Sequence, residues 1–200
     1  MAKNSSSQSG SFNLRVVITV LLCAFSASLG WLSFAASPSG GTITPSGPTL
    51  TWTGTGNGVP PAAGGESDCE QGANCDAFKL TISGTPADWV AAGKQVKVRI
   101  VWLLNSSDYD LYVHKGSLDG PVIASSGAGG TTFEEVTLNP NSSNIGTGDF
   151  FVNVVYFAAT QADQYNGSAA VVAAGAPPIP APTPASGVAP RYQNHTPPAA

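Results

Sequence analysis

Residues 95–104 read QVKVRIVWLL, and this segment has the clearest strand pattern in the chain. From its second residue onward every other side chain is apolar, a period of two that is typical of a half-buried β-strand. The turn-forming residues 105–108 (NSSD) follow, and the alternation resumes over residues 109–114 (YDLYVH). We therefore expect residues 95–104 and 109–114 to pair as a β-hairpin.

Other short strands are expected on both sides of this hairpin. Turn residues separate them, and no segment has a convincing amphipathic helical pattern, since residues 87–92 could form at most one turn. About eight strands spaced in this way favour an all-β fold, an antiparallel β-sandwich of jelly-roll or Greek-key type spanning residues 49–174. The further predicted strands cover residues 49–53, 75–82, 121–124, 132–138, 149–158 and 168–173.

Composition and charge limit the classes of partner. Only 10% of the 200 residues are charged, and the formal net charge is −4. Such a chain has no basic field to attract nucleic acid, so nucleic acid is not an expected partner. Few charges together with many Gly, Ser and Thr residues suit an extracellular all-β protein better than a helical one.

Residues 1–35 have the layout of a secretory signal. Lys3 and Arg15 precede an apolar stretch, and Ser33 and Ala35 supply the small residues that a cleavage site needs. We expect a signal peptide here. The alternative is an uncleaved membrane anchor, because the apolar stretch is long enough to span a bilayer. With the signal removed, the protein is expected to be secreted, extracellular or periplasmic, and to have no membrane contact.

Segments rich in Pro, Gly and Ser flank the predicted domain. Residues 36–48 are expected to be a linker, and residues 175–200 a Pro-rich disordered tail or linker. Because a linker normally joins two domains, the second segment either is a disordered tail or leads to a domain beyond residue 200.

Two cysteines remain once the signal is removed. Cys69 and Cys75 enclose a short Gly-containing loop, and in an oxidising compartment such a pair predicts a disulfide. A zinc site would need two further Cys or His ligands nearby, and the neighbouring sequence has none.

Several motifs together resemble one known family, the bacterial pre-peptidase C-terminal domain, a small β-sandwich appended to secreted proteases and other exported hydrolases. The resemblance covers residues 75–157, about two fifths of the chain, and implies an accessory role in tethering to a polymer or surface, or in export. Some members of that family bind calcium or a fibrous substrate. Residues 191–195 are also similar to the stretch that leads into sialidase-like β-propellers of exported bacterial proteins. The family motifs are Trp102, residues 108–113, 122–126, 134–138 and 148–154.

The chain lacks the residues of a catalytic site. His114 is the one imidazole of the predicted domain, whereas nucleophilic catalysis needs an imidazole positioned by a carboxylate and beside a nucleophile. Glu134 and Glu135 are adjacent on a predicted strand, so their side chains point to opposite faces and cannot act on one substrate. We therefore expect a non-catalytic chain.

A possible ligand face lies on the side of the strands away from the core. It comprises apolar and aromatic residues whose exposure would mark an interaction surface. The alternative is that the strand around Trp52, or the long loops, cover this face. The candidate residues are Val101, Leu103, Tyr112, Phe151 and Phe157.

Calcium is a possible cofactor, because clustered carboxylates suit this hard cation. One cluster lies in the loop before the second strand: Glu66, Asp68, Glu70 and Asp76. Another is Asp108 and Asp110 on the predicted hairpin, joined by His114, and the hairpin pairing would place His114 beside Arg99 and Asp110 beside Leu103. The alternatives are a solvated loop held by the disulfide and a solvated sheet face.

These observations favour a secreted accessory module that binds an extracellular polysaccharide, a protein or a cell surface. One alternative is the N-terminal portion of an exported hydrolase, a sialidase-like glycosidase or a protease, whose catalytic domain lies beyond residue 200. Another is a structural surface protein. The sequence does not indicate the oligomeric state.

Overall fold

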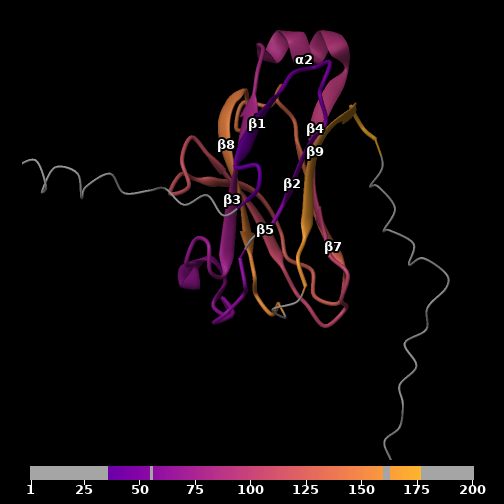
Figure 1. Cartoon of the computed structure of the whole chain (residues 1–200). Coiled ribbons are helices and arrows are strands. Elements are labelled where there is room, and N and C mark those ends of the chain that lie inside the picture. Colours follow the sequence, from indigo (N-terminus) through magenta and orange to yellow (C-terminus); the bar gives the residue numbers. More distant parts are fainter. Residues whose placement is uncertain (1–35, 55, 160–162, 177–200) are drawn as a thin grey trace, which may run out of the picture. The chain divides into compact units, whose positions relative to one another are not determined.

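A computed structural model describes residues 36–54, 56–159 and 163–176, which form two packed β-sheets (Figure 1). The predicted signal or anchor at residues 1–35, and the predicted tail from residue 177 onward, lie outside the described residues. Within the described part of the chain, no helix has the length and apolar character needed to cross a membrane.

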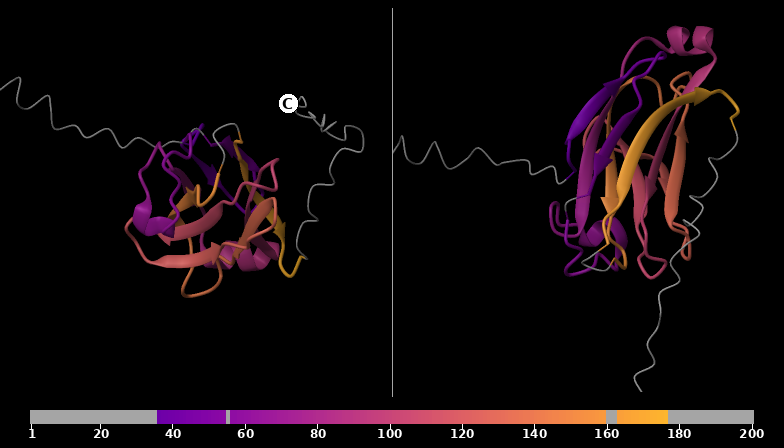
Figure 2. Two further views of the ribbon diagram at one scale, coloured as in Figure 1. Left: turned by 90° about the horizontal axis from the view of Figure 1, so that it is seen from below. Right: turned by 45° about the vertical axis from the view of Figure 1, so that its right-hand side comes forward.

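The nine described strands fall into two sheets, seen as separate layers in Figure 2. The first sheet has the spatial order β1 (Gly40–Ile43), β3 (Cys75–Ile82), β8 (Gly148–Val155), β5 (Asp110–Lys115) and β6 (Val122–Ser126). The second has the order β2 (Leu50–Thr53), β9 (Asn166–Ala173), β4 (Lys94–Val101) and β7 (Phe133–Leu138). Among these strands only β1 and β3 pair in parallel. The all-β sandwich expected from the sequence is confirmed.

The core lies between the two sheets and follows from the alternation in the sequence. Inward residues of β3, β4, β5 and β8 are almost fully buried, whereas polar residues occupy most of the alternate positions. Trp52 from the second sheet stacks on Phe78 from the first, with ring centroids 4.0 Å apart. The inward residues include Phe78, Leu80, Ile82, Val96, Val98, Ile100, Leu111, Val113, Phe150, Val152 and Val154.

The expected hairpin between residues 95–104 and 109–114 is wrong. β4 belongs to the second sheet and β5 to the first, so the connection crosses from one layer to the other. Trp102 and Tyr109 are both buried and lie in contact, with centroids 5.0 Å apart, and the Trp102 indole donates a hydrogen bond to the carbonyl of Ser107 at 3.0 Å. These buried rings hold the connection as an arch, and the predicted pairing of His114 with Arg99 does not form.

The segment 36–48, expected to be a linker, contributes strand β1. Its residues pair with β3, Gly40 opposite Lys79 and Ile43 opposite Ile82. A Cβ atom at Gly40 would lie 2.8 Å from the carbonyl oxygen of Lys79, so glycine permits this close approach. The linker prediction failed because Ile43 is the one buried apolar side chain of the strand, which leaves no alternating pattern to detect.

Residues 86–92 form a helix where at most one turn was expected. Helix α2 (Pro86–Ala92) begins with Thr85, whose hydroxyl accepts a hydrogen bond from the Asp88 backbone while the Asp88 carboxylate accepts one from Thr85. Trp89 anchors the helix: its side chain is fully buried and its indole donates to the carbonyl of Ser83 at 2.9 Å. This capping box and one buried ring stabilise a helix too short to show amphipathic periodicity.

Candidate functional site

A pocket lies on the outer face of the first sheet, beneath the loop that carries the disulfide. This loop includes the single-turn helix η1 (Gly65–Asp68) and covers outward residues of β5 and β8. We call it the loop pocket; its volume is about 490 Å³, within the range of small-molecule sites. Its lining residues are Glu66, Cys69, Gln71, His114, Leu118, Asp119, Gly120 and Asn153.

The loop is fixed by covalent and polar contacts. The predicted disulfide between Cys69 and Cys75 is confirmed. The side chain of Asn74, which is buried, donates to the carbonyls of Pro60 and Asp68 at 2.9 and 3.1 Å and accepts from the backbone of Glu70. The wall of the pocket is therefore held in place before any ligand binds.

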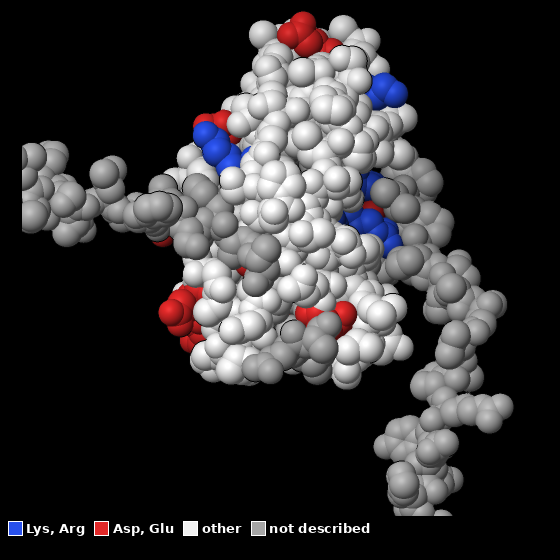
Figure 3. Space-filling model, in the orientation of Figure 1, with Lys and Arg blue, Asp and Glu red and all other residues white. Residues whose placement is uncertain are grey.

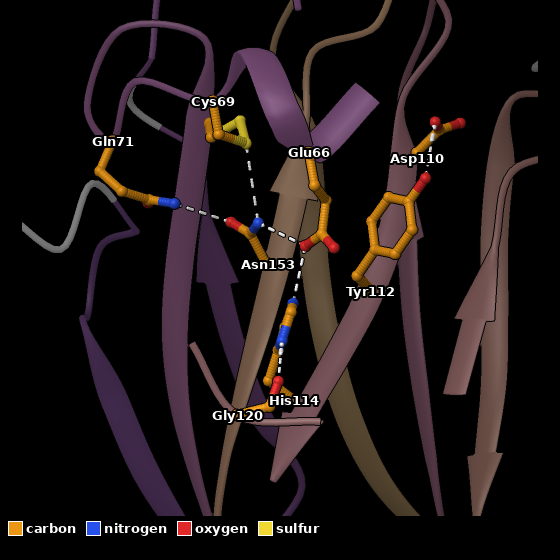
Figure 4. Close-up of polar contacts among 9 residues, drawn as sticks. Glu66, Cys69, Gln71, Asp110, Tyr112, His114, Gly120 and Asn153 are labelled. Atoms are coloured by element: carbon orange, nitrogen blue, oxygen red, sulfur yellow. Dashed lines mark hydrogen bonds and ion pairs between the residues drawn. A yellow bond between two sulfur atoms is a disulfide. The ribbon is translucent and has the colours of Figure 1, made fainter. Parts of the chain in front are cut away.

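Four side chains from three parts of the chain form one hydrogen-bonded network in the pocket (Figure 4). His114 on β5 contacts Glu66 of the loop through Nε2 at 2.7 Å. Asn153 on β8 donates to the same Glu66 oxygen at 2.8 Å and accepts from Gln71 at 2.9 Å. His114 and Asn153 are both more than nine-tenths buried, so the network is rigid at its base.

Both ring nitrogens of His114 are engaged. Nδ1 lies 2.9 Å from the carbonyl oxygen of Gly120, which can only accept, so Nδ1 carries a proton. Nε2 faces a carboxylate oxygen of Glu66, and one further proton lies between these two atoms. Neither nitrogen is therefore free to take a proton from a nucleophile.

Tyr112 and Asp110 lie beside the network on β5 (Figure 4). The Tyr112 hydroxyl donates to the Asp110 carboxylate at 3.4 Å. Burial raises the pKa of Asp110, and the negative charges of Asp108, Glu134 and Glu66 raise it further. The pKa of Tyr112 is raised by burial and then by Asp110 and Glu66. The potential on this side of the pocket is thus negative.

The predicted ligand face is divided between the two sheets. Val101 and the strongly exposed Leu103 belong to β4 and the arch after it, whereas Tyr112 and Phe151 belong to the first sheet. Phe157 follows β8 and is half-buried. Tyr112 and Phe151 share the outer face of the first sheet with the pocket residues Asn153 and His114, their register partners, so the five candidates are not all on one face.

The carboxylates expected to bind calcium are also separated. Asp76 is fully buried in β3 and accepts a hydrogen bond from the Tyr156 hydroxyl at 2.7 Å, while Asp68 accepts from the backbone of Gly64 within its own loop. Burial and then the nearby Asp76 raise the pKa of Tyr156. Among the residues that the structure describes, no three His, Cys, Asp or Glu side chains are grouped to hold a metal ion. Glu66 faces His114 instead of its acidic neighbours in the sequence.

The adjacent Glu134 and Glu135 point to opposite faces of β7. Glu134 is buried and accepts hydrogen bonds from the Ser126 hydroxyl and the Ala128 backbone. Glu135 forms ion pairs with Lys97 and Arg99, which are both buried. Both carboxylates have structural partners.

Sequence reasoning missed five lining residues: Gln71, Leu118, Asp119, Gly120 and Asn153. The sequence does contain an indication for Asn153, because it is the one polar residue in the apolar segment FFVNVVYF, residues 150–157. A polar side chain in such a strand needs a hydrogen-bonding partner when buried. Residues of surface loops, such as Asp119, carry no comparable signal.

Removing the disulfide is expected to loosen the pocket wall. The double substitution Cys69→Ser/Cys75→Ser should lower the free energy of unfolding by about 2 kcal/mol, because the closed loop is short. Amide hydrogen exchange of residues 64–74 should accelerate more than that of β4 on the opposite sheet. Uniform acceleration across both sheets would show that the bond does not act locally.

No protein-family model matches this sequence, and no curated protein matches it. Among solved structures, the chain is similar to the pre-peptidase C-terminal domain of a collagenase from Bacillus anthracis. The match covers 66% of this chain and 94% of that chain, with 13% sequence identity and a TM-score of 0.36. That domain is of the family that the sequence motifs resemble.

Proposed function

We propose that this chain is a non-catalytic accessory module that binds an extracellular polymer through the loop pocket. The supporting observation is the network of Glu66, His114, Asn153 and Gln71, which is built from a disulfide-linked loop and two adjacent strands. Polar groups held in fixed positions around a concave site are what recognition of a polar ligand requires.

Binding is favoured over catalysis by the state of the imidazole. Its two nitrogens are occupied by Gly120 and Glu66, and within the part of the chain that the structure describes no Ser, Thr or Lys lines the pocket to serve as a nucleophile. A polysaccharide is favoured over an apolar protein surface because the lining includes two amide and two carboxylate side chains, groups that pair with hydroxyls.

The first experiment is retention of the full chain on a panel of insoluble polysaccharides and fibrous proteins, with calcium and with a chelator. We expect retention on at least one polysaccharide. Loss of that retention in chelator would support the calcium hypothesis, and unchanged retention would count against it. Absence of retention on every member of the panel would contradict the proposed function.

The substitution Gln71→Ala tests whether binding occurs in the loop pocket. It removes one wall of the pocket and one hydrogen bond of the network, so the dissociation constant should rise about tenfold, or about 1.4 kcal/mol. Gln95→Ala is the matched control, since Gln95 is equally half-buried but lies on β4 of the other sheet. If the two variants bind alike, the ligand occupies another face.

A further inference from the structure

The loop pocket carries unpaired acceptors. Every N–H of the His114 ring is used within the wall, and the Asn153 amide donates to Glu66. Oxygen atoms remain: within the described residues Gln71 Oε1 is buried without a partner, and only one oxygen of the Glu66 carboxylate is in a hydrogen bond. An acceptor left without a donor costs free energy, and a ligand bearing donors can pair with the second oxygen of Glu66, whose side chain is 25% exposed.

The charge of the pocket lining is negative, which favours the same kind of ligand, one that bears hydrogen-bond donors. Its ionisable lining residues are Glu66, His114 and Asp119, and among the described residues no Lys or Arg lines it. His114 and Glu66 share a proton, and we count this pair as neutral. One negative charge then remains in the lining, on the exposed Asp119. Figure 3 shows acidic side chains gathered at the lower left, where the purple loop of Figure 1 lies. An anionic ligand would be repelled here, and a cation attracted.

From these observations we infer that the loop pocket binds a primary ammonium group carried on a sugar ring, as in a deacetylated amino-sugar polymer; this inference rests on the proposed function. The ammonium supplies three donors and a positive charge, which suit the second carboxylate oxygen of Glu66 and the carboxylate of Asp119. A lysine side chain would bring the same group on an apolar stem that offers no further hydrogen-bond donors or acceptors. Ring hydroxyls instead match the amides and the Gly120 carbonyl around the pocket.

Calorimetric titration of the full chain with soluble oligomers tests this inference. The probes are a glucosamine hexamer, its fully N-acetylated form, a glucose hexamer and a lysine-containing hexapeptide, at about pH 6 where amines are protonated. We expect the glucosamine hexamer to bind at least about tenfold more tightly than each of the others. Its affinity should fall as salt is added, because added ions screen the attraction.

Two substitutions test the residues. Asp119→Asn removes the negative charge from a side chain with no described contact, and Glu66→Gln removes the carboxylate shared with His114; each should weaken glucosamine binding about tenfold. Asp149→Asn is the control, because Asp149 is an exposed carboxylate paired with Lys79 outside the pocket. Because Glu66→Gln also alters the loop, Asp119→Asn decides the outcome if the two disagree.

The failures of the two proposals can be told apart. If neutral hexamers bind as tightly as glucosamine and Asp119→Asn has no effect, the ammonium inference is overturned while the binding function stands. If the lysine peptide binds best, the saccharide assignment is overturned. If no probe binds and no polymer of the panel retains the chain, both proposals are overturned.

Discussion

Replacing Phe78 by alanine should lower the free energy of unfolding by about 3–5 kcal/mol, the largest loss that we expect from one substitution. Phe78 is 1% exposed on β3, and its ring stacks on Trp52 of the facing sheet at an interplanar angle of 11°. The substitution removes buried apolar area and leaves a cavity between the two layers, which the surrounding strands can close only in part. Denaturant unfolding of the full chain, followed by tryptophan fluorescence, measures the loss.

Phe157→Ala is the matched control for Phe78→Ala. The chemical change is the same, but Phe157 is half-buried beyond the end of β8. Its substitution should cost clearly less. Equal losses for the two variants would contradict the central position of the Phe78 ring in the core.

Gly167→Ala should destabilise the fold by about 3 kcal/mol, at the upper end for a small-to-large change. Gly167 on β9 is the register partner of Trp52 on β2, and a Cβ atom there would lie 2.0 Å from the Trp52 ring. Because Trp52 is itself stacked on Phe78, the indole can move away from the added methyl group only by disturbing this stack or the pairing of the two strands. The same unfolding experiment measures this effect.

Gly129→Ala provides the control for the added methyl group. The nearest described atom to a Cβ there is a carboxylate oxygen of Asp108 at 3.9 Å, an ordinary contact. Its effect should stay within about 0.5 kcal/mol of zero. If Gly167→Ala is equally tolerated, the indole does not lie where the structure places it.

The two core substitutions are expected to be coupled. Phe78→Ala opens space on the side of Trp52 away from Gly167, into which the indole can shift when Gly167→Ala is also present. The double variant should therefore lose less free energy than the sum of the single losses. Strict additivity would show that Trp52 does not connect the two positions.

Half of the candidate site was visible in the sequence. The disulfide followed from two cysteines around a short loop, and His114 and Tyr112 were correctly placed on the face of their strand away from the core. The contacts of Glu66 were not predictable, because His114 lies 48 residues and Asn153 lies 87 residues from it in the sequence. Alternation assigns a side chain to a face, but it does not say which loop will cover that face.

The sequence by itself determined which side of each strand is buried, because a period of two in apolar residues marks that side, and its burial drives the formation of a sandwich. The tertiary structure decided the partners. β4 and β5 were expected to pair because they are adjacent in the chain, yet the buried rings of Trp102 and Tyr109 place them in different sheets. Strand pairing and the loop pocket depend on contacts between residues that are distant in the sequence. The free energy of these contacts is distributed over the whole core, so a local sequence pattern does not reveal it.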